Sequence, residues 1–305
     1  MAFVVAGASG NVGSAVVTSL AASGESVKAL TRSSASEKIS RLKDLPGIQI
    51  VQCDLTDPST LQGLFAGARG AFLCYGNCKQ QAAAEKGFID CAVAEGCPYL
   101  VKLGTVRSYT SLDSPIEYAR YHAEIEAHLE STAGQMKWTV LCPNWFFSNH
   151  LGDLFGGIPQ KNVVAYPIDT KAKATMVDPR DVADVAVALL LAEEATQSRC
   201  HKLKLDISGP EEVSTSDIAQ MFTEALGREI QAVNCEREEW LAVAAQAGAL
   251  EDWHARAVLL NFPLWKAGDL VFPTSAEVLQ LAPPKRTMRQ WIQEWAPRSP
   301  PLLKP

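Results

Sequence analysis

The sequence lacks the features that mark several special classes of protein. Its 28 Lys and Arg against 34 Asp and Glu give a formal net charge of −6, and no cluster of basic residues offsets that excess, so no nucleic-acid partner is expected. No apolar run reaches the length of a membrane span, and the longest, at 182–192, contains Asp184. The five His are dispersed without an H-E-x-x-H motif, so no metal site is expected. The absence of G-x-S-x-G disfavours a hydrolase.

Cysteine is present without the spacing of a disulfide or redox framework. The eight Cys include no C-x-x-C pair, and the opening residues MAFVVAG form a strand-like run without a basic segment before it. We therefore expect no signal peptide, reduced thiols and a cytoplasmic location. Cys74 and Cys78 follow a predicted strand, where small buried side chains are the simpler interpretation and a redox role is the alternative.

Short apolar runs alternate with amphipathic stretches through the first half of the 305 residues. Strands are predicted at 2–7, 26–32, 48–55, 70–76, 99–105 and 137–143, and helices at 11–22, 36–45, 58–67, 79–96 and 115–132. This repeated strand–helix order predicts an α/β fold with a doubly wound parallel sheet.

After Pro143 the alternation loosens. A strand is predicted near 162–168, a helix from about 179, a strand ending at Gly209 and a helix at 215–226, with Ser214 or Ser216 as its N-cap. We expect residues 1–145 to form the sheet core, to which later segments return. Residues 146–305 are expected to form mainly a smaller C-terminal α/β lobe that binds the substrate.

A glycine-rich loop joins the first predicted strand to the first helix. In the sequence GASGNVG, Gly7 allows a tight turn, Gly10 allows the backbone to approach a pyrophosphate, and Gly13 lets the helix pack on the strand. The N–H groups at the helix N-terminus would then face the phosphate. Dinucleotide binding is predicted, and a purely structural turn is the alternative. The loop residues expected to contact the dinucleotide are Gly7, Ser9, Gly10, Asn11, Val12 and Gly13.

The residue after the second predicted strand indicates whether the cofactor is NAD or NADP(H). An Asp or Glu at this position would hold the ribose of NAD, but this chain has Arg32 followed by Ser33. A guanidinium can pair with a 2′-phosphate, so NADP(H) is predicted, with a solvated Arg as the alternative. Asp54, at the end of the third strand, would lie beside the adenine or cap the next helix, and Leu55 follows it.

Taken in order, several segments resemble the NmrA-like family of atypical short-chain dehydrogenases. They are GASGNVG at 7–13, LTRSS at 30–34, VQCDLTD at 51–57, YLVKLGT at 99–105, SPIEYARYHAEIE at 114–126, WTVLCPNWFFSN at 138–149, MVDPRDVADVA at 176–186 and GPEEVSTSDIA at 209–219. The resemblance implies a Rossmann domain that holds NADP(H) along the carboxyl edge of its sheet, and a lobe that closes the substrate cleft. The remaining cofactor contacts are then expected at Tyr75, Gly76, Lys102, Pro143, Asn144 and Phe146.

Reductases of the wider superfamily use a Tyr-x-x-x-Lys pair on one helical face. Here Tyr118 and His122 have that spacing, and His can serve as a proton donor near neutral pH. Lys102 is a third candidate, because it could reach the nicotinamide ribose. Packing on the sheet is the alternative role for the pair. The family's usual Ser after the fifth strand is replaced by Gly104, although Thr105 could supply a hydroxyl, and Cys142 stands where the family commonly has Arg.

Aromatic side chains from several segments could form an apolar substrate pocket. Those expected to contact the substrate are Tyr109, Trp145, Phe147, Trp253 and Trp265. The sequence therefore predicts an NADPH-dependent reductase of a small organic molecule such as a quinone, enone, imine or specialised metabolite, acting as a monomer or homodimer. The alternatives are a non-catalytic NADP(H) sensor that binds a partner protein, and an isomerase or lyase that retains its cofactor.

Overall fold

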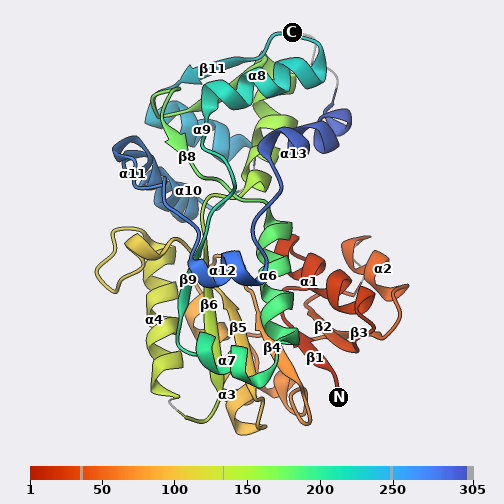
Figure 1. Ribbon diagram of the computed structural model, residues 1–305. Helices are drawn as coiled ribbons and strands as arrows, with labels where there is room; N and C mark the ends of the chain where they lie inside the picture. The colour runs from red at the N-terminus through yellow and green to blue at the C-terminus, as the bar shows by residue number, and fades with distance from the viewer. Residues whose placement is uncertain (35–36, 133, 248–249, 301–305) are drawn as a thin grey trace.

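The fold is built on a parallel sheet of seven strands. The structure, a computed structural model, describes residues 1–34, 37–132, 134–247 and 250–300. The strand order is β3-β2-β1-β4-β5-β6-β9, and every neighbouring pair is parallel (Figure 1). The strands are β1 (Phe3–Val5), β2 (Val27–Thr31), β3 (Ile48–Gln52), β4 (Gly70–Leu73), β5 (Tyr99–Leu103), β6 (Lys137–Pro143) and β9 (Lys204–Ile207). The doubly wound Rossmann fold that the sequence predicts is therefore confirmed.

Helices cover both faces of this sheet, because the strands are apolar on both faces. Phe3 and Val5 in β1 belong to the cluster that includes α1 (Asn11–Ala22) and α6 (Pro179–Leu191). Val4, between them, faces the opposite cluster, which includes α3 (Gln81–Ala94) and α4 (Glu117–Ser131). The smaller helix α2 (Glu37–Lys43) follows β2.

The predicted helix at 58–67 is wrong in length and type. The structure has a four-residue 3₁₀ helix, Pro58–Leu61, whose N-cap Asp57 accepts a hydrogen bond from the Ser59 N–H. Gly63 and Gly67 both adopt positive φ angles, +76° and +67°, that a helix cannot include. The strands predicted at 2–7, 26–32, 48–55, 70–76 and 99–105 are also too long, since β1 to β5 are each two or three residues shorter than predicted.

A second layer lies above the carboxyl ends of the strands (Figure 1). It contains two small sheets, β7 (Val163–Tyr166) with β11 (Gln231–Asn234) and β8 (Lys173–Ala174) with β10 (Val213–Ser214). Around them lie a π-helical turn (Asp153–Gly157), α5 (Ile158–Lys161), α8 (Thr215–Leu226), α9 (Arg237–Ala247), α10 (Asp252–Leu259), α11 (Asn261–Ala267) and α13 (Met288–Trp295). We call this layer the lobe. It has its own apolar core, around Phe222 and Trp265. Ser214, not Ser216, caps α8.

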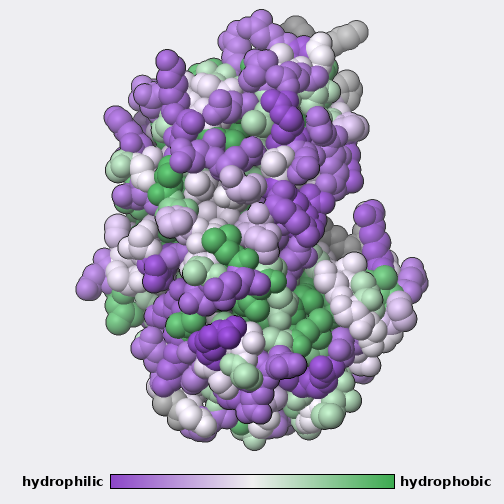
Figure 2. Space-filling view, in the orientation of Figure 1, coloured by the Kyte–Doolittle hydropathy of each residue, from purple (hydrophilic) through white to green (hydrophobic). Residues whose placement is uncertain are grey.

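The chain returns from the lobe to the sheet. Helix α6 packs along α1, and after α7 (Glu194–Cys200) strand β9 pairs with β6. Helix α12 (Ala276–Leu281) then packs against α6 and β9. The lobe is thus tied to the sheet by several crossings, and Figure 2 shows the surface hollowed between the lobe and the side that carries α1 and α2. In the part of the chain that the structure describes, none of the helices is long and apolar enough to span a bilayer.

Candidate active site

The glycine loop brings the start of α1 against the end of the sheet. Gly7 has φ +69°, and its carbonyl accepts a hydrogen bond of 2.8 Å from the Gly10 N–H. A Cβ on Gly13 would lie 2.2 Å from the Gly7 oxygen, so only glycine fits there. Gly10 is the N-cap of α1 and provides no side-chain cap. The first turn of a twelve-residue helix therefore opens toward the carboxyl edge with backbone N–H groups, an arrangement suited to a phosphate.

Polar residues continue this edge beyond β2 and β3. Arg32 is exposed immediately after β2. Asp54 accepts hydrogen bonds from the N–H and hydroxyl of Thr56, at 2.9 and 2.7 Å, and these bonds, helped by the Arg32 charge, lower the pKa of Asp54. The cap of the following 3₁₀ helix is Asp57, so Asp54 does not serve that role. Leu55 is buried in the core beneath the sheet.

A cavity of about 730 Å³ lies between the carboxyl ends of the central strands and the lobe. From the sheet edge it is lined by Tyr75, Gly76, Leu103, Gly104, Pro143, Asn144 and Phe146, and from α4 by Tyr118 and His122. The lobe contributes a mainly apolar and aromatic wall that includes Trp145, Val163, Tyr166, Trp240 and Val258. This size and this mixture of apolar wall and few polar groups are typical of small-molecule sites.

His122 is the cavity-lining member of a buried polar cluster. Lys102 Nζ lies 2.9 Å from His122 Nδ1, 2.8 Å from the Leu103 carbonyl oxygen and 3.2 Å from Glu85 Oε2. The side chains of Lys102 and Glu85 are both fully buried. The Gln81 amide lies 3.3 Å from the other ring nitrogen, Nε2, and donates to Glu85 at 3.0 Å.

Burial sets the protonation of this cluster. Burial, together with the Lys102 charge, holds the pKa of His122 well below its ordinary value, so the imidazole is neutral at neutral pH. Lys102 Nζ faces Nδ1 and the Gln81 amide nitrogen faces Nε2, so the neutral ring, which carries a single N–H, accepts a hydrogen bond on at least one of these two sides. Burial also raises the pKa of Glu85, an effect that Lys102 opposes.

Tyr118 is held from the lobe rather than by a lysine. Its hydroxyl donates to Asn261 Oδ1 at 3.1 Å and lies 2.9 Å from Asn261 Nδ2, and Asn261 is anchored to the Val258 carbonyl at 2.9 Å. Burial raises the pKa of Tyr118 to about 12. Tyr109 hydrogen-bonds both Tyr118 and Thr105. The phenol therefore stays protonated and fixed at the cavity wall.

A model of the NmrA-like family matches residues 2–251. The chain belongs to this family. It is 29% identical over 300 residues to the (4-alkanoyl-5-oxo-2,5-dihydrofuran-3-yl)methyl phosphate reductase of Streptomyces griseus, a match that covers 96% of this chain and 97% of the relative.

Two solved structures show the same fold as this NmrA-like chain. The NADPH complex of an NADPH-dependent quinone oxidoreductase from Escherichia coli matches with a TM-score of 0.78 at 20% identity, covering 96% of this chain and 99% of the other. NmrA, a negative transcriptional regulator in complex with NADP, matches with a TM-score of 0.75 at 17% identity, covering 97% and 95%. At these identities the likeness establishes the shared architecture.

The structure gathers some of the sequence-predicted site residues of this NmrA-like chain and separates others. Those at the wall of the large cavity are Tyr75, Gly76, Tyr109, Tyr118, His122, Pro143, Asn144, Trp145 and Phe146. Phe147 and Trp265 are fully buried in the lobe core, and Trp253 packs against Tyr121 and His254 outside the wall. Lys102 lies beneath His122.

Other residues near the site were not anticipated from the sequence. His254, Asp153, Tyr166 and Trp240 line the cavity, and Asn261 binds Tyr118. No local motif marks them, because they come from separate lobe segments. At Gly104 a Cβ would approach a Val140 methyl group to 2.9 Å and the Leu141 oxygen to 3.1 Å, so a larger residue there would crowd β6.

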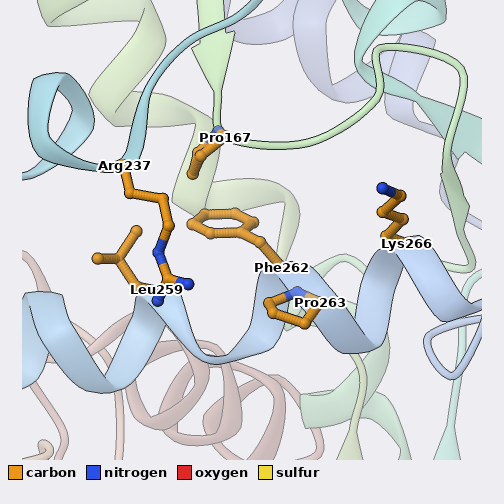
Figure 3. Close-up of a pocket in the computed structure, with 6 residues that line it drawn as sticks. All are labelled: Pro167, Arg237, Leu259, Phe262, Pro263 and Lys266. Carbon is orange, nitrogen blue, oxygen red and sulfur yellow. The ribbon is translucent and has the colours of Figure 1, made fainter.

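A second cavity, of about 270 Å³, lies on the lobe (Figure 3). Pro167, Leu259, Phe262 and Pro263 make it apolar, and Arg237 and Lys266 stand at its sides. None of its six lining residues is an acid or a nucleophile. Among the described residues, no group of three or more His, Cys, Asp or Glu could hold a metal ion.

Proposed function

We propose that this chain is an NADP(H)-dependent reductase of a small, mainly apolar organic molecule with a conjugated C=O, C=C or C=N group. The observation that carries the proposal is the cavity at the carboxyl edge of the sheet, where His122 stands in an otherwise largely apolar wall with the buried Lys102 behind it. The named activities of the Streptomyces and Escherichia relatives, which are both reductions, favour a quinone or enone.

The residues of the sheet edge fit NADP(H). The glycine loop leaves backbone N–H groups at the start of α1 and no side chain at its N-cap, Gly10, which suits a pyrophosphate. Arg32, exposed just after β2, would pair with a 2′-phosphate. Tyr75, Gly76, Pro143 and Phe146 continue the same edge into the cavity. When bound, NADPH supplies a hydride to the substrate.

His122 and Lys102 would supply the proton that completes the reduction. As negative charge develops on the substrate, His122 would give up its single ring proton, and Lys102 Nζ, 2.9 Å from Nδ1, would supply a proton to the ring. The neutral Lys102 is then reprotonated before the next turnover.

Tyr118 would act as a positioning residue. A phenol with its pKa raised to about 12 is a poor acid. If Asn261 Nδ2 donates to the phenol oxygen, 2.9 Å away, the hydroxyl hydrogen can turn from Asn261 Oδ1 to a substrate oxygen. Removal of the Tyr118 hydroxyl should disturb the orientation of the substrate more than it slows proton transfer.

The test is NADPH consumption by the purified full chain with a panel of quinones, enones and imines. His122→Gln should lower kcat by about a hundredfold, Tyr118→Phe by about tenfold or less, and both should fold normally by circular dichroism. His128→Gln is the matched control, because His128 lies on the same helix and binds Asp90 on the surface. Tight NADPH binding with no turnover of any panel member would refute the reductase and leave a regulator of the NmrA kind.

A further inference from the structure

The lobe wall of the cavity carries a buried carboxylate that the proposed chemistry does not use. Asp153 opens the π-helical turn, and its Oδ2 accepts a hydrogen bond from the Tyr166 hydroxyl at 2.9 Å and lies 2.7 Å from His150 Nδ1. Asp153 and Tyr166 both line the cavity, whereas His150 is fully buried behind them. The carboxylate is therefore fixed in place from the side away from the cavity.

The second oxygen of this carboxylate has no hydrogen-bond partner among the residues that the structure describes. Both hydrogen bonds end on Oδ2, and no described residue donates to Oδ1. Only 10% of the Asp153 side chain is exposed. Because Asp153 lines the cavity, Oδ1 is open to it and can accept a hydrogen bond from a ligand there.

The position of Asp153 is built into the fold. The turn that carries it runs against β7, the strand that ends in Tyr166, and at Gly157 a Cβ would approach the Val163 oxygen to 2.7 Å. This close approach holds the Asp153–Tyr166 pair together.

The other charged residues that line the cavity do not form an ion pair with Asp153. Lys161 and Glu239 also line the cavity, but they lie 4.0 Å apart and are mostly exposed at its rim. Of the three charged residues that line the cavity, Asp153 is therefore the buried one, and it pairs with His150 behind the wall. A phosphate group, such as the one in the name of the Streptomyces relative's substrate, would find no cation beside Asp153 in this wall.

We propose that Asp153 is a specificity-determining residue that binds a hydrogen-bond donor, a hydroxyl or an amine, on an otherwise apolar substrate. The donor binds Oδ1 on the lobe side, while the reducible group lies near His122 on the sheet side. This inference rests on the proposed function only in taking the cavity as the substrate site.

The test uses a matched series of enones: unsubstituted chalcone and its para-hydroxy, para-methoxy and para-aminomethyl derivatives. Binding to the full chain, with and without NADP⁺, is measured by quenching of tryptophan fluorescence, since Trp145 and Trp240 line the cavity, and is checked by calorimetry. This readout needs no turnover. If NADPH reduces none of the four, the donor preference can still be measured, and the proposed function is decided separately by its own panel of quinones, enones and imines.

The hydroxy compound should bind about tenfold or more tightly than the methoxy compound, since a hydrogen bond to a charged acceptor has that effect on Kd. A still larger preference for the aminomethyl compound would also support the proposal and would make the preferred donor a cation. In Asp153→Asn, the amide oxygen remains with Tyr166 and His150 and its NH₂ group faces the cavity, so the preference for donors should disappear.

Glu239→Gln is the matched control and should keep the preference for hydrogen-bond donors. Tyr166→Phe should keep it too, because Asp153 and its Oδ1 are still present in that variant. Equal binding of the hydroxy, methoxy and unsubstituted compounds by the wild-type chain would overturn the proposal even if Asp153→Asn failed to fold. An unchanged preference in a folded Asp153→Asn variant would also overturn it.

Discussion

Alanine substitutions at two glycines of the loop should have different effects, one mainly on folding stability and the other mainly on cofactor binding. A Cβ at Gly13 would lie 2.2 Å from the Gly7 oxygen, and at Gly10 it would lie 3.2 Å from the same atom. Ordinary contacts begin at 3.4 Å, so Gly13→Ala must push α1 away from the loop by about an ångström, whereas Gly10→Ala requires a few tenths. Gly10 has φ −81°, which any residue can adopt.

Overpacking of this kind costs about 1–3 kcal/mol, offset by up to ~1 kcal/mol for replacing glycine in a helix. Gly13→Ala should therefore lower the free energy of unfolding by about 1–2 kcal/mol without cofactor present. Gly10→Ala should leave stability within about 0.5 kcal/mol of wild type but weaken NADPH binding at least tenfold, because its methyl group would occupy the space of the phosphate.

Urea unfolding of the cofactor-free chain and NADPH titration by fluorescence measure the two effects. Gly87→Ala in α3 is the control, because the nearest atom to its new Cβ would be 3.8 Å away, and it should be as stable as wild type or slightly more so. The reasoning is refuted if Gly13→Ala is as stable as wild type, or if Gly10→Ala binds NADPH as tightly as wild type does.

Three further predictions use other residues. Arg32→Glu should cut the preference for NADPH over NADH by tenfold or more, measured as the ratio of the two Kd values, and an unchanged ratio would exclude Arg32 as the phosphate ligand. The pKa of His122 is lowered, so its contribution to stability is present above about 6.5 and is lost as pH falls. Urea midpoints should fall from pH 7 to pH 5 more steeply in wild type than in His122→Gln, and equal slopes would contradict a neutral buried ring. Burial raises the pKa of Cys74 to about 12, so iodoacetamide at pH 7 should leave it unmodified in mass spectra of the native chain; rapid labelling would show a reactive thiol instead.

The sheet and its phosphate loop could be predicted from the sequence because their signals are local. Strand β6 and helices α1 and α8 have the predicted bounds, since apolar periodicity and the Ser214 cap lie within the segments themselves. The helix predicted at 58–67 failed because its two glycines adopt backbone angles that composition alone does not reveal.

For the catalytic candidates, local sequence patterns predict the position of the side chains but not their distant hydrogen-bond partners. The spacing of Tyr118 and His122 indicates a shared helical face, and both line one cavity. It does not reveal that Lys102 supports His122 from within the core, or that Asn261, 143 residues away in the sequence, engages the Tyr118 hydroxyl.

The sequence by itself determined the βα order, the glycine loop and the presence of Arg32 after the second strand. These depend on turn geometry and on side-chain periodicity over a few residues. Only the tertiary structure decided which aromatic residues line the cavity and which, such as Phe147 and Trp265, lie in the lobe core. It also placed Asp153 on the lobe wall with one oxygen that no described residue contacts by a hydrogen bond, because burial and pairing of a polar group depend on how separate segments pack.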